Sequence, residues 1–195
     1  MISKIFRQKG IKFAAILVFQ IVLLAGMVLS SYLVILQGEK MTLQVEPVDP
    51  RSLFQGDYVI LNYSFNNLDL SEISHDLVPE KVQDQQPVYL AFSQKNDIWA
   101  PDFVTQDAAK VKGRTYIKGK ILYLSRKPME PEERPDSVDY NSLPLTMLRA
   151  NWGIEQYYVP EGQGKVIEQQ IQDGIVYAQV SVYHGKSRVT GLLTE

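Results

Sequence analysis

A run of 24 uncharged residues, FAAILVFQIVLLAGMVLSSYLVIL (13–36), divides this 195-residue chain into two unequal parts. As a helix rising about 1.5 Å per residue, the run would be roughly 36 Å long, enough to cross a hydrocarbon core of about 30 Å with some tilt. Fifteen of its residues are Ile, Leu, Val or Phe. At about −0.3 to −0.6 kcal/mol each, they favour insertion by roughly 4.5 to 9 kcal/mol, so the run predicts a transmembrane helix.

A cleaved signal peptide is the alternative interpretation, because such peptides also begin with basic residues. Their apolar region is shorter, at about 7–15 residues, and it ends in a small-x-small cleavage site. Here the apolar run is longer, and the sequence SSYLVIL (30–36) lacks such a cleavage site. We therefore expect an uncleaved anchor in contact with the lipid bilayer through residues 13–36.

The charges on either side of the anchor predict its orientation. The segment 1–12 carries four bases and no acid, whereas Glu39 and Lys40 follow the helix as a mixed pair. Basic flanks stay in the cytoplasm, so we expect a cytoplasmic N-terminus and a periplasmic or extracellular domain at 41–195, held by the cell (inner) membrane of a bacterial source. Residues 37–40 reach at most about 14 Å, which keeps this domain close to the bilayer.

Composition excludes several classes of function. The net charge is −2, and since residues 1–36 carry +4, the remainder carries −6; such an acidic domain is poorly suited to nucleic acid. The chain has no cysteine, so disulfides, thiolate metal sites and cysteine nucleophiles are excluded. His75 and His184 are too isolated for a ligand cluster. We expect no metal and no cofactor.

The outer domain alternates in polarity over several short segments, which is typical of strands. We expect strands at 41–48, 57–65, 87–93 and 115–124, and a C-terminal hairpin that turns at residues 184–186. Short helices are expected at 66–78 and 165–173, and the proline-rich, acidic segment 125–141 reads as a long loop. The expected fold is mainly β with a few short helices, an antiparallel sandwich or half-open barrel.

The densest motif is DPRSLFQGDYVILNYSF (49–65). Backbone geometry explains part of it: Asp49 can cap a helical turn, Pro50 suits the first helical position, and Gly56 can leave the turn in a left-handed conformation. This interpretation does not account for Arg51 or for the second acid, Asp57. A chemical site is therefore the competing interpretation.

The segment GDYVILNY (56–63) resembles the pattern that names the GDYXXLXY family of bacterial membrane-anchored proteins. The segments PVDPR (47–51) and GIEQYYVPEG (153–162) are similar to the rest of that pattern, so the resemblance spans essentially the whole outer domain. It implies an uncharacterised family, some members of which are joined to or encoded beside multi-pass membrane proteins. The resemblance implies no enzymatic activity. It does imply a multi-pass membrane protein as a partner.

A more distant resemblance concerns type I signal peptidases, which are also membrane-anchored and β-rich. The segment 52–62 is similar to the turn and strand that follow their nucleophile, 116–118 to the segment with their catalytic lysine, here Lys118, and 159–163 to a later strand. The nucleophilic serine would fall at Val48, which supplies no oxygen. The resemblance thus implies the fold without the protease.

The motif residues form the candidate binding site, and no residue is expected to be catalytic. They are Asp49, Arg51, Gly56, Asp57, Tyr58, Leu61, Tyr63, Glu155, Tyr158, Pro160, Glu161 and Gly162. Three interpretations of the five charged members stay open, namely a structural ion-pair network, a surface for a partner's basic side chain, and catalysis.

Two functions follow. The first is a non-enzymatic accessory protein whose outer domain binds a membrane protein or an envelope component. The second is a membrane-anchored hydrolase that uses Lys118 with Ser52 or Ser64, or the carboxylates of Asp57 and Glu155.

Overall fold

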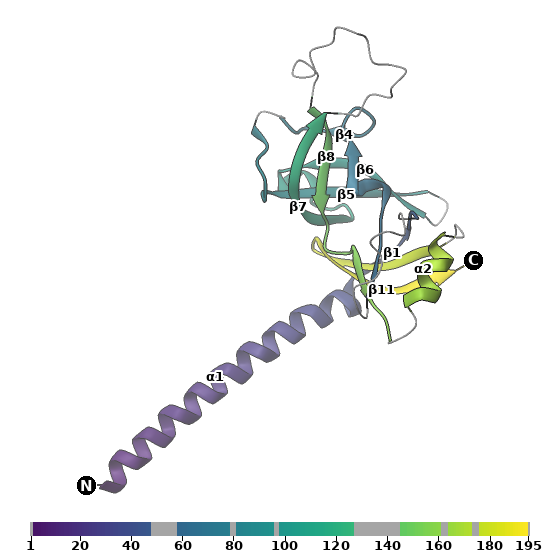
Figure 1. The fold of residues 1–195 in the computed structure, drawn as a ribbon. Coiled ribbons are helices and arrows are strands. Elements are labelled where there is room, and N and C mark those ends of the chain that lie inside the picture. Colours follow the sequence, from purple (N-terminus) through teal and green to yellow (C-terminus); the bar gives the residue numbers. More distant parts are fainter. Residues whose placement is uncertain are drawn as a thin grey trace.

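A computed structural model describes residues 2–47, 58–78, 81–95, 98–126, 145–160, 164–172 and 176–194. Figure 1 shows one long helix, α1, that projects from a β-rich body, with the N-terminus at the far end of the helix. The prediction of a mainly β domain preceded by one apolar helix is confirmed.

Helix α1 runs over Ile2–Gln37 and strand β1 over Glu39–Gln44, so only Gly38 separates them. The expected four-residue tether is therefore wrong, because Gln37 belongs to the helix and Glu39 and Lys40 belong to the strand. The stretch Lys12–Gln37 has a mean hydropathy of 2.5 and is long and apolar enough to cross a membrane. Up to Ser30 its side chains are exposed, and its C-terminal end contacts the body, where Val34 is buried.

The sheet nearest the helix has the strand order β1-β10-β11, with β10 at Val176–Tyr183 and β11 at Lys186–Thr194. All its pairs are antiparallel, and Met41 of β1 lies opposite Val180 of β10. The β10–β11 hairpin turns at His184 and Gly185, whose φ angles are 49° and 77°. Positive φ at both central residues is typical of a type I′ turn, and the predicted hairpin is confirmed.

The largest sheet has the order β3-β8-β7-β5-β6-β4. Its strands are antiparallel, apart from the parallel pair of β4 and β6. Their bounds are β3 Asn67–Asp69, β4 Ser74–His75, β5 Pro87–Lys95, β6 Ile98–Thr105, β7 Tyr116–Arg126 and β8 Leu145–Asn151. The sheets do not close into a barrel, so of the two predicted architectures the sandwich is confirmed.

A third, two-stranded sheet pairs β2 (Tyr58–Ile60) with β9 (Gln156–Tyr158). The helix α2 (Gly164–Gln172) was predicted and lies against β2. Two 3₁₀ turns, η2 (Ser64–Asn66) and η4 (Ala108–Val111), complete the described elements.

Three local predictions differ from the structure. The helix expected at 66–78 is replaced by β3 and β4, because Asp69 Oδ1 accepts hydrogen bonds from the Ser71 amide (2.9 Å) and hydroxyl (2.6 Å), which form a tight turn in place of a helix. The strand expected at 57–65 is described from Tyr58, ends at Ile60 and gives way to η2, although its alternating apolar side chains are buried. The expected loop at 125–141 begins later, since β7 continues to Arg126, and the remainder lies outside the described residues.

The three sheets enclose one hydrophobic core. At its centre the Phe65 ring stacks on Tyr63 at 5.0 Å and meets Phe92 and Trp152 edge-on at 5.3 and 6.3 Å between centroids. The indole Nε1 of Trp152 donates to the Phe65 carbonyl at 3.0 Å, so the one polar atom of this ring is paired inside the core. The segment that follows the motif Tyr63 thus forms the centre of the fold.

Candidate functional site

The two sequence motifs lie side by side in the structure. Strand β2 of the first motif pairs antiparallel with β9 of the second, and Tyr58 lies opposite Tyr158 with ring centroids 5.9 Å apart. The Leu61 amide continues the ladder by donating to the Glu155 carbonyl at 2.8 Å. The two motifs therefore converge in their described parts.

Tyr63, the last tyrosine of the first motif, is a core residue. Its side chain is 1% exposed, and its hydroxyl donates to the Ile154 carbonyl of the second motif at 3.1 Å. Burial raises the pKa of Tyr63 far above the ordinary tyrosine value, and the negative charge of Glu155 raises the pKa further. A neutral phenol in this position ties the two motifs together, and the fully buried Leu61 packs in the same core.

Glu155 and Gly153 shape the turn before β9. Gly153 has a φ of 76°, a left-handed conformation that favours glycine, and its amide donates to Asn151 Oδ1 at 2.9 Å. The Glu155 carboxylate accepts a hydrogen bond from the Trp152 amide at 2.5 Å. This carboxylate therefore satisfies a backbone donor in a tight turn, which is a structural use of a predicted site residue.

Other motif residues face outward. Tyr158 is 73% exposed, the side chain of Pro160 is exposed, and Tyr58 is half-buried beside Tyr158. We call the side chains of Tyr58 and Tyr158 the aromatic ladder face. Together with Pro160, it is a part of the two motifs that a second molecule can reach among the described residues.

The remaining candidates are outside the described residues. They are Asp49, Arg51, Gly56, Asp57, Glu161 and Gly162, together with the possible nucleophile Ser52. The charged constellation proposed from the sequence therefore stays a prediction for these members. Within the described part of the chain, no group of three His, Cys, Asp or Glu side chains is placed to hold a metal ion.

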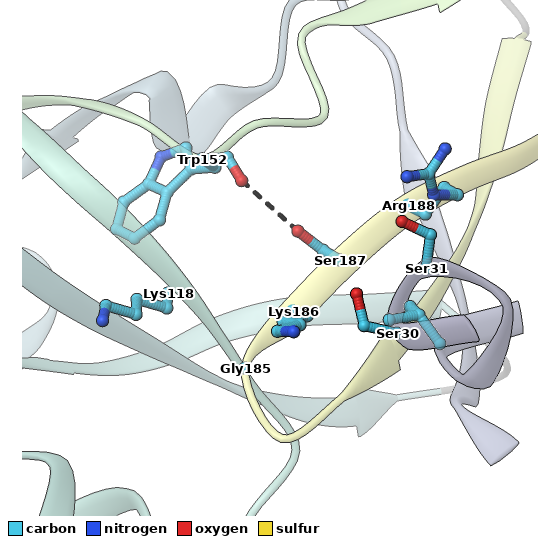
Figure 2. A pocket seen from close by; sticks show the side chains of 9 residues that line it. Ser30, Ser31, Lys118, Trp152, Gly185, Lys186, Ser187 and Arg188 are labelled. Atoms are coloured by element: carbon cyan, nitrogen blue, oxygen red, sulfur yellow. Dashed lines mark hydrogen bonds between the residues drawn. The ribbon is translucent and has the colours of Figure 1, made fainter. Parts of the chain in front are cut away.

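Lys118, the candidate lysine of a hydrolase, is directed at an aromatic ring. Its Nζ lies 5.9 Å from the centroid of Tyr89. Figure 2 shows its ammonium pointing away from Ser187 and Ser30, which share a cavity with it. Ser64 lines neither of the two described cavities to which Lys118 contributes. The described positions thus favour no serine–lysine pair.

Sequence reasoning missed a polar cavity where α1 meets the body. Ser30 and Ser31 of the helix line it together with Lys186 and Arg188 of β11. The signals in the sequence were a serine pair inside an apolar run and the basic segment KSR (186–188) within an acidic domain. Neither signal indicated that the two segments meet, because only the tertiary fold brings β11 to the end of the helix.

Comparison with known proteins gives one relationship. No curated protein and no solved structure matches the chain. The sequence model of one family, described as GDYXXLXY protein, matches residues 20–192. This match includes the second half of α1, both motif strands and the C-terminal hairpin. The chain therefore belongs to the GDYXXLXY protein family.

Proposed function

We propose that this protein is a non-enzymatic accessory protein, anchored by a single transmembrane helix, whose outer domain binds a membrane protein or an envelope component. In this proposal α1 crosses the cell (inner) membrane with its N-terminus in the cytoplasm, and the β domain lies on the outer surface. The support is the apolar rod of α1, whose side chains from Phe13 to Ser30 are exposed and match the apolar interior of a bilayer.

The observation that carries the proposal is the rigid junction between helix and domain. Val34 is 3% exposed, and its carbonyl accepts hydrogen bonds from Ser181 Oγ of β10 at 2.6 Å and from the Gly38 amide at 3.1 Å. A side chain at Gly38 would collide with that carbonyl and with Ser181 Oγ. A helix fixed in this way holds the domain in one orientation to the bilayer, which suits the presentation of a surface to a neighbour in the same membrane.

The aromatic ladder face is the surface that we expect to be presented. Tyrosines are enriched at the centres of protein interfaces, where their large rings bind at a low cost in side-chain entropy. Tyr58 and Tyr158 belong to the two motifs that converge in β2 and β9, and Tyr158 remains exposed although it is large. A partner that covers this pair would bury aromatic area that the fold leaves in water.

The test is site-specific photocrosslinking in the native membrane. A photoreactive residue replaces Tyr158 in the full chain, and a matched variant carries it at Tyr123, a 45% exposed tyrosine of β7. We expect position 158 to capture one stoichiometric membrane or envelope component that position 123 does not capture, and Tyr58→Ser to reduce this capture. Recovery of the uncrosslinked chain alone from both positions would contradict the proposal.

A further inference from the structure

The cavity at the end of α1 lies between the helix and the β10–β11 hairpin. It has a volume of about 330 Å³, at the lower end of the range of small-ligand sites. The helix contributes Ser30, Ser31 and Val34, and the hairpin contributes its segment 185–188. The cavity is therefore bounded on one side by the proposed membrane anchor and on the other by the outer domain.

The described lining of this cavity is basic. Lys118, Lys186 and Arg188 contribute to it, and none of its lining residues is acidic. The ion pairs among the described residues involve other cations, Lys110 with Asp76 and Arg114 with Asp102. In a domain whose net charge is −6, a gathering of unneutralised cations indicates a site for an anion.

One hydroxyl group of the helix is placed for the same ligand. The Ser30 hydroxyl donates to the Met27 carbonyl at 2.9 Å, whereas Figure 2 shows the Ser31 hydroxyl turned toward β11, the strand of Lys186 and Arg188. The Lys118 ammonium points toward the Tyr89 ring. It therefore adds positive charge near the cavity but makes no direct contact with a ligand there. Two cations and the Ser31 hydroxyl around one space suit a phosphate group, because arginine, lysine and serine all donate to phosphate oxygens.

The depth of the cavity matches the headgroup region of a bilayer. Lys12 is the last charged residue of α1, and about 20 helical residues cross the hydrocarbon core. Counted from Phe13, the core ends near Tyr32, a 53% exposed aromatic residue of the kind that marks membrane interfaces. Ser30 and Ser31 therefore lie where the hydrocarbon gives way to phosphate groups.

An apolar groove continues from the cavity along the helix. It has a volume of about 370 Å³ and is lined by Met27, Val28, Tyr32 and Ile35. Ser31 and Arg188 line both the groove and the basic cavity, so the two spaces adjoin. This continuity favours an amphiphile, with an anionic head at the cations and an acyl chain in the groove, over a free phosphate ion.

We propose that the junction between α1 and β11 binds one anionic phospholipid. Its phosphate accepts hydrogen bonds from Lys186, Arg188 and the Ser31 hydroxyl, and one acyl chain lies in the groove. The proposal rests on the membrane-spanning helix of the proposed function and adds a specific ligand at its outer end. Such a lipid would fill the space between the helix and the hairpin and support the orientation that the Gly38 junction sets.

The test is native mass spectrometry of the full chain in a neutral detergent, titrated with phosphatidylglycerol or with phosphatidylcholine of the same acyl chains. We expect one phosphatidylglycerol to be retained and phosphatidylcholine to be lost. The variant K186Q/R188Q should weaken retention about thirtyfold, from the loss of two cations close to an anionic headgroup. The matched variant K120Q/R149Q removes the same charge from exposed positions of β7 and β8 outside this cavity and should retain the lipid as the natural chain does.

Two further measurements distinguish failure of the lipid site from failure of the membrane anchor. If inorganic phosphate binds the natural chain while phosphatidylglycerol is not retained, the site takes free phosphate and the lipid proposal is wrong. Equal retention of the two lipids, or unchanged retention in K186Q/R188Q, would also overturn it. Alkaline carbonate extraction is run in parallel, because release of the natural chain from membranes would refute the anchor itself, whereas a carbonate-resistant chain without lipid preference would refute the lipid site alone.

Discussion

At the scale of single residues, the two motifs divide into a buried part and a presented part. Tyr63, Leu61 and Glu155 satisfy hydrogen bonds or fill the core, and they connect the first motif to the second. Tyr158 is placed by the same ladder but stays in solvent. Replacing a buried member should therefore affect stability, whereas replacing Tyr158 should affect binding and leave the fold intact.

Tyr63→Phe tests the buried part. Removing the hydroxyl leaves the buried Ile154 carbonyl without its partner, so the free energy of unfolding should fall by about 1–3 kcal/mol. The full chain in detergent is unfolded with urea, and Trp fluorescence reports the transition because Trp152 lies beside Phe65. An unchanged midpoint would contradict the structural role of this hydroxyl.

The same variant should change the dependence of stability on pH. Burial, aided by the charge of Glu155, holds the pKa of Tyr63 above its value of about 10 in the unfolded chain. The folded state therefore keeps the proton longer, and the stabilisation is complete below pH of about 10 and is lost as the pH rises above it. Tyr63→Phe should flatten this alkaline loss, and Tyr123→Phe at an exposed position should leave it as it is in the natural chain.

At the scale of elements, the β10–β11 turn joins two sheets. The Gly185 carbonyl accepts from the Lys118 amide of β7 at 2.8 Å, and Ile117 forms a parallel bridge with Gly185. A side chain at Gly185 would press against the Tyr116 ring, and its φ of 77° disfavours any residue with a Cβ. The glycine is thus required both by the turn and by its contact with the other sheet.

Gly185→Ala should accordingly destabilise the protein by about 1–3 kcal/mol through strain and lost docking of the turn. Gly191→Ala is the matched control, since its Cβ would meet only Gln179 Oε1 at the ordinary distance of 3.6 Å. Urea unfolding of both variants gives the comparison. Equal midpoints for the two variants would show that the turn does not carry the contact between the sheets.

The junction of α1 with β1 gives a second prediction at this scale. Gly38→Ala should break the packing of Gly38 against Val34 and Ser181 and speed hydrogen exchange of the backbone at 34–44 by about tenfold or more. Gly26→Ala, where a Cβ meets nothing within 4 Å, should leave this exchange unchanged. Equal exchange in the two variants, measured by mass spectrometry, would mean that the junction is not rigid.

The elements that the sequence predicted are those with a strong local pattern. The apolar run of α1, the amphipathic α2 and the hairpin with glycine at its turn each depend on residues close in sequence. Strand β6 was missed because it contains Pro101, which lacks an amide hydrogen and lies next to an irregularity in the ladder with β5. Its strand conformation depends on pairing with β5 and β4, and a local sequence pattern carries no information about this pairing.

The candidate site likewise has features that the sequence could predict and features that depend on the tertiary fold. Convergence of the two motifs could be expected from their resemblance to one family pattern, but the exposure of Tyr158 and the burial of Tyr63 depend on which faces of the ladder the sheets cover. The basic cavity at Ser31 and Arg188 was not predictable, because 156 residues of chain separate two segments that only the completed fold brings together.

At the scale of the whole molecule, a basic N-terminal segment is followed by an apolar rod and an acidic β body at its far end (Figure 1). Only Gly38 lies between the rod and strand β1, and the end of the rod also contacts β10 and β11, so the position of the body follows from that of the helix. Every proposal made above, from the presented tyrosines to the lipid at β11, requires the helix to span the bilayer with the body on the outer side.

The absence of cysteine makes this requirement directly measurable. Single cysteines are introduced as Ser3→Cys in the basic segment and as Gln169→Cys on the exposed face of α2, and sealed cells are treated with a membrane-impermeant maleimide. We expect Gln169→Cys to be labelled in sealed cells, Ser3→Cys to be labelled only after the membrane is permeabilised, and both chains to resist carbonate extraction. The reverse labelling pattern, or release of the chain by carbonate, would contradict the account.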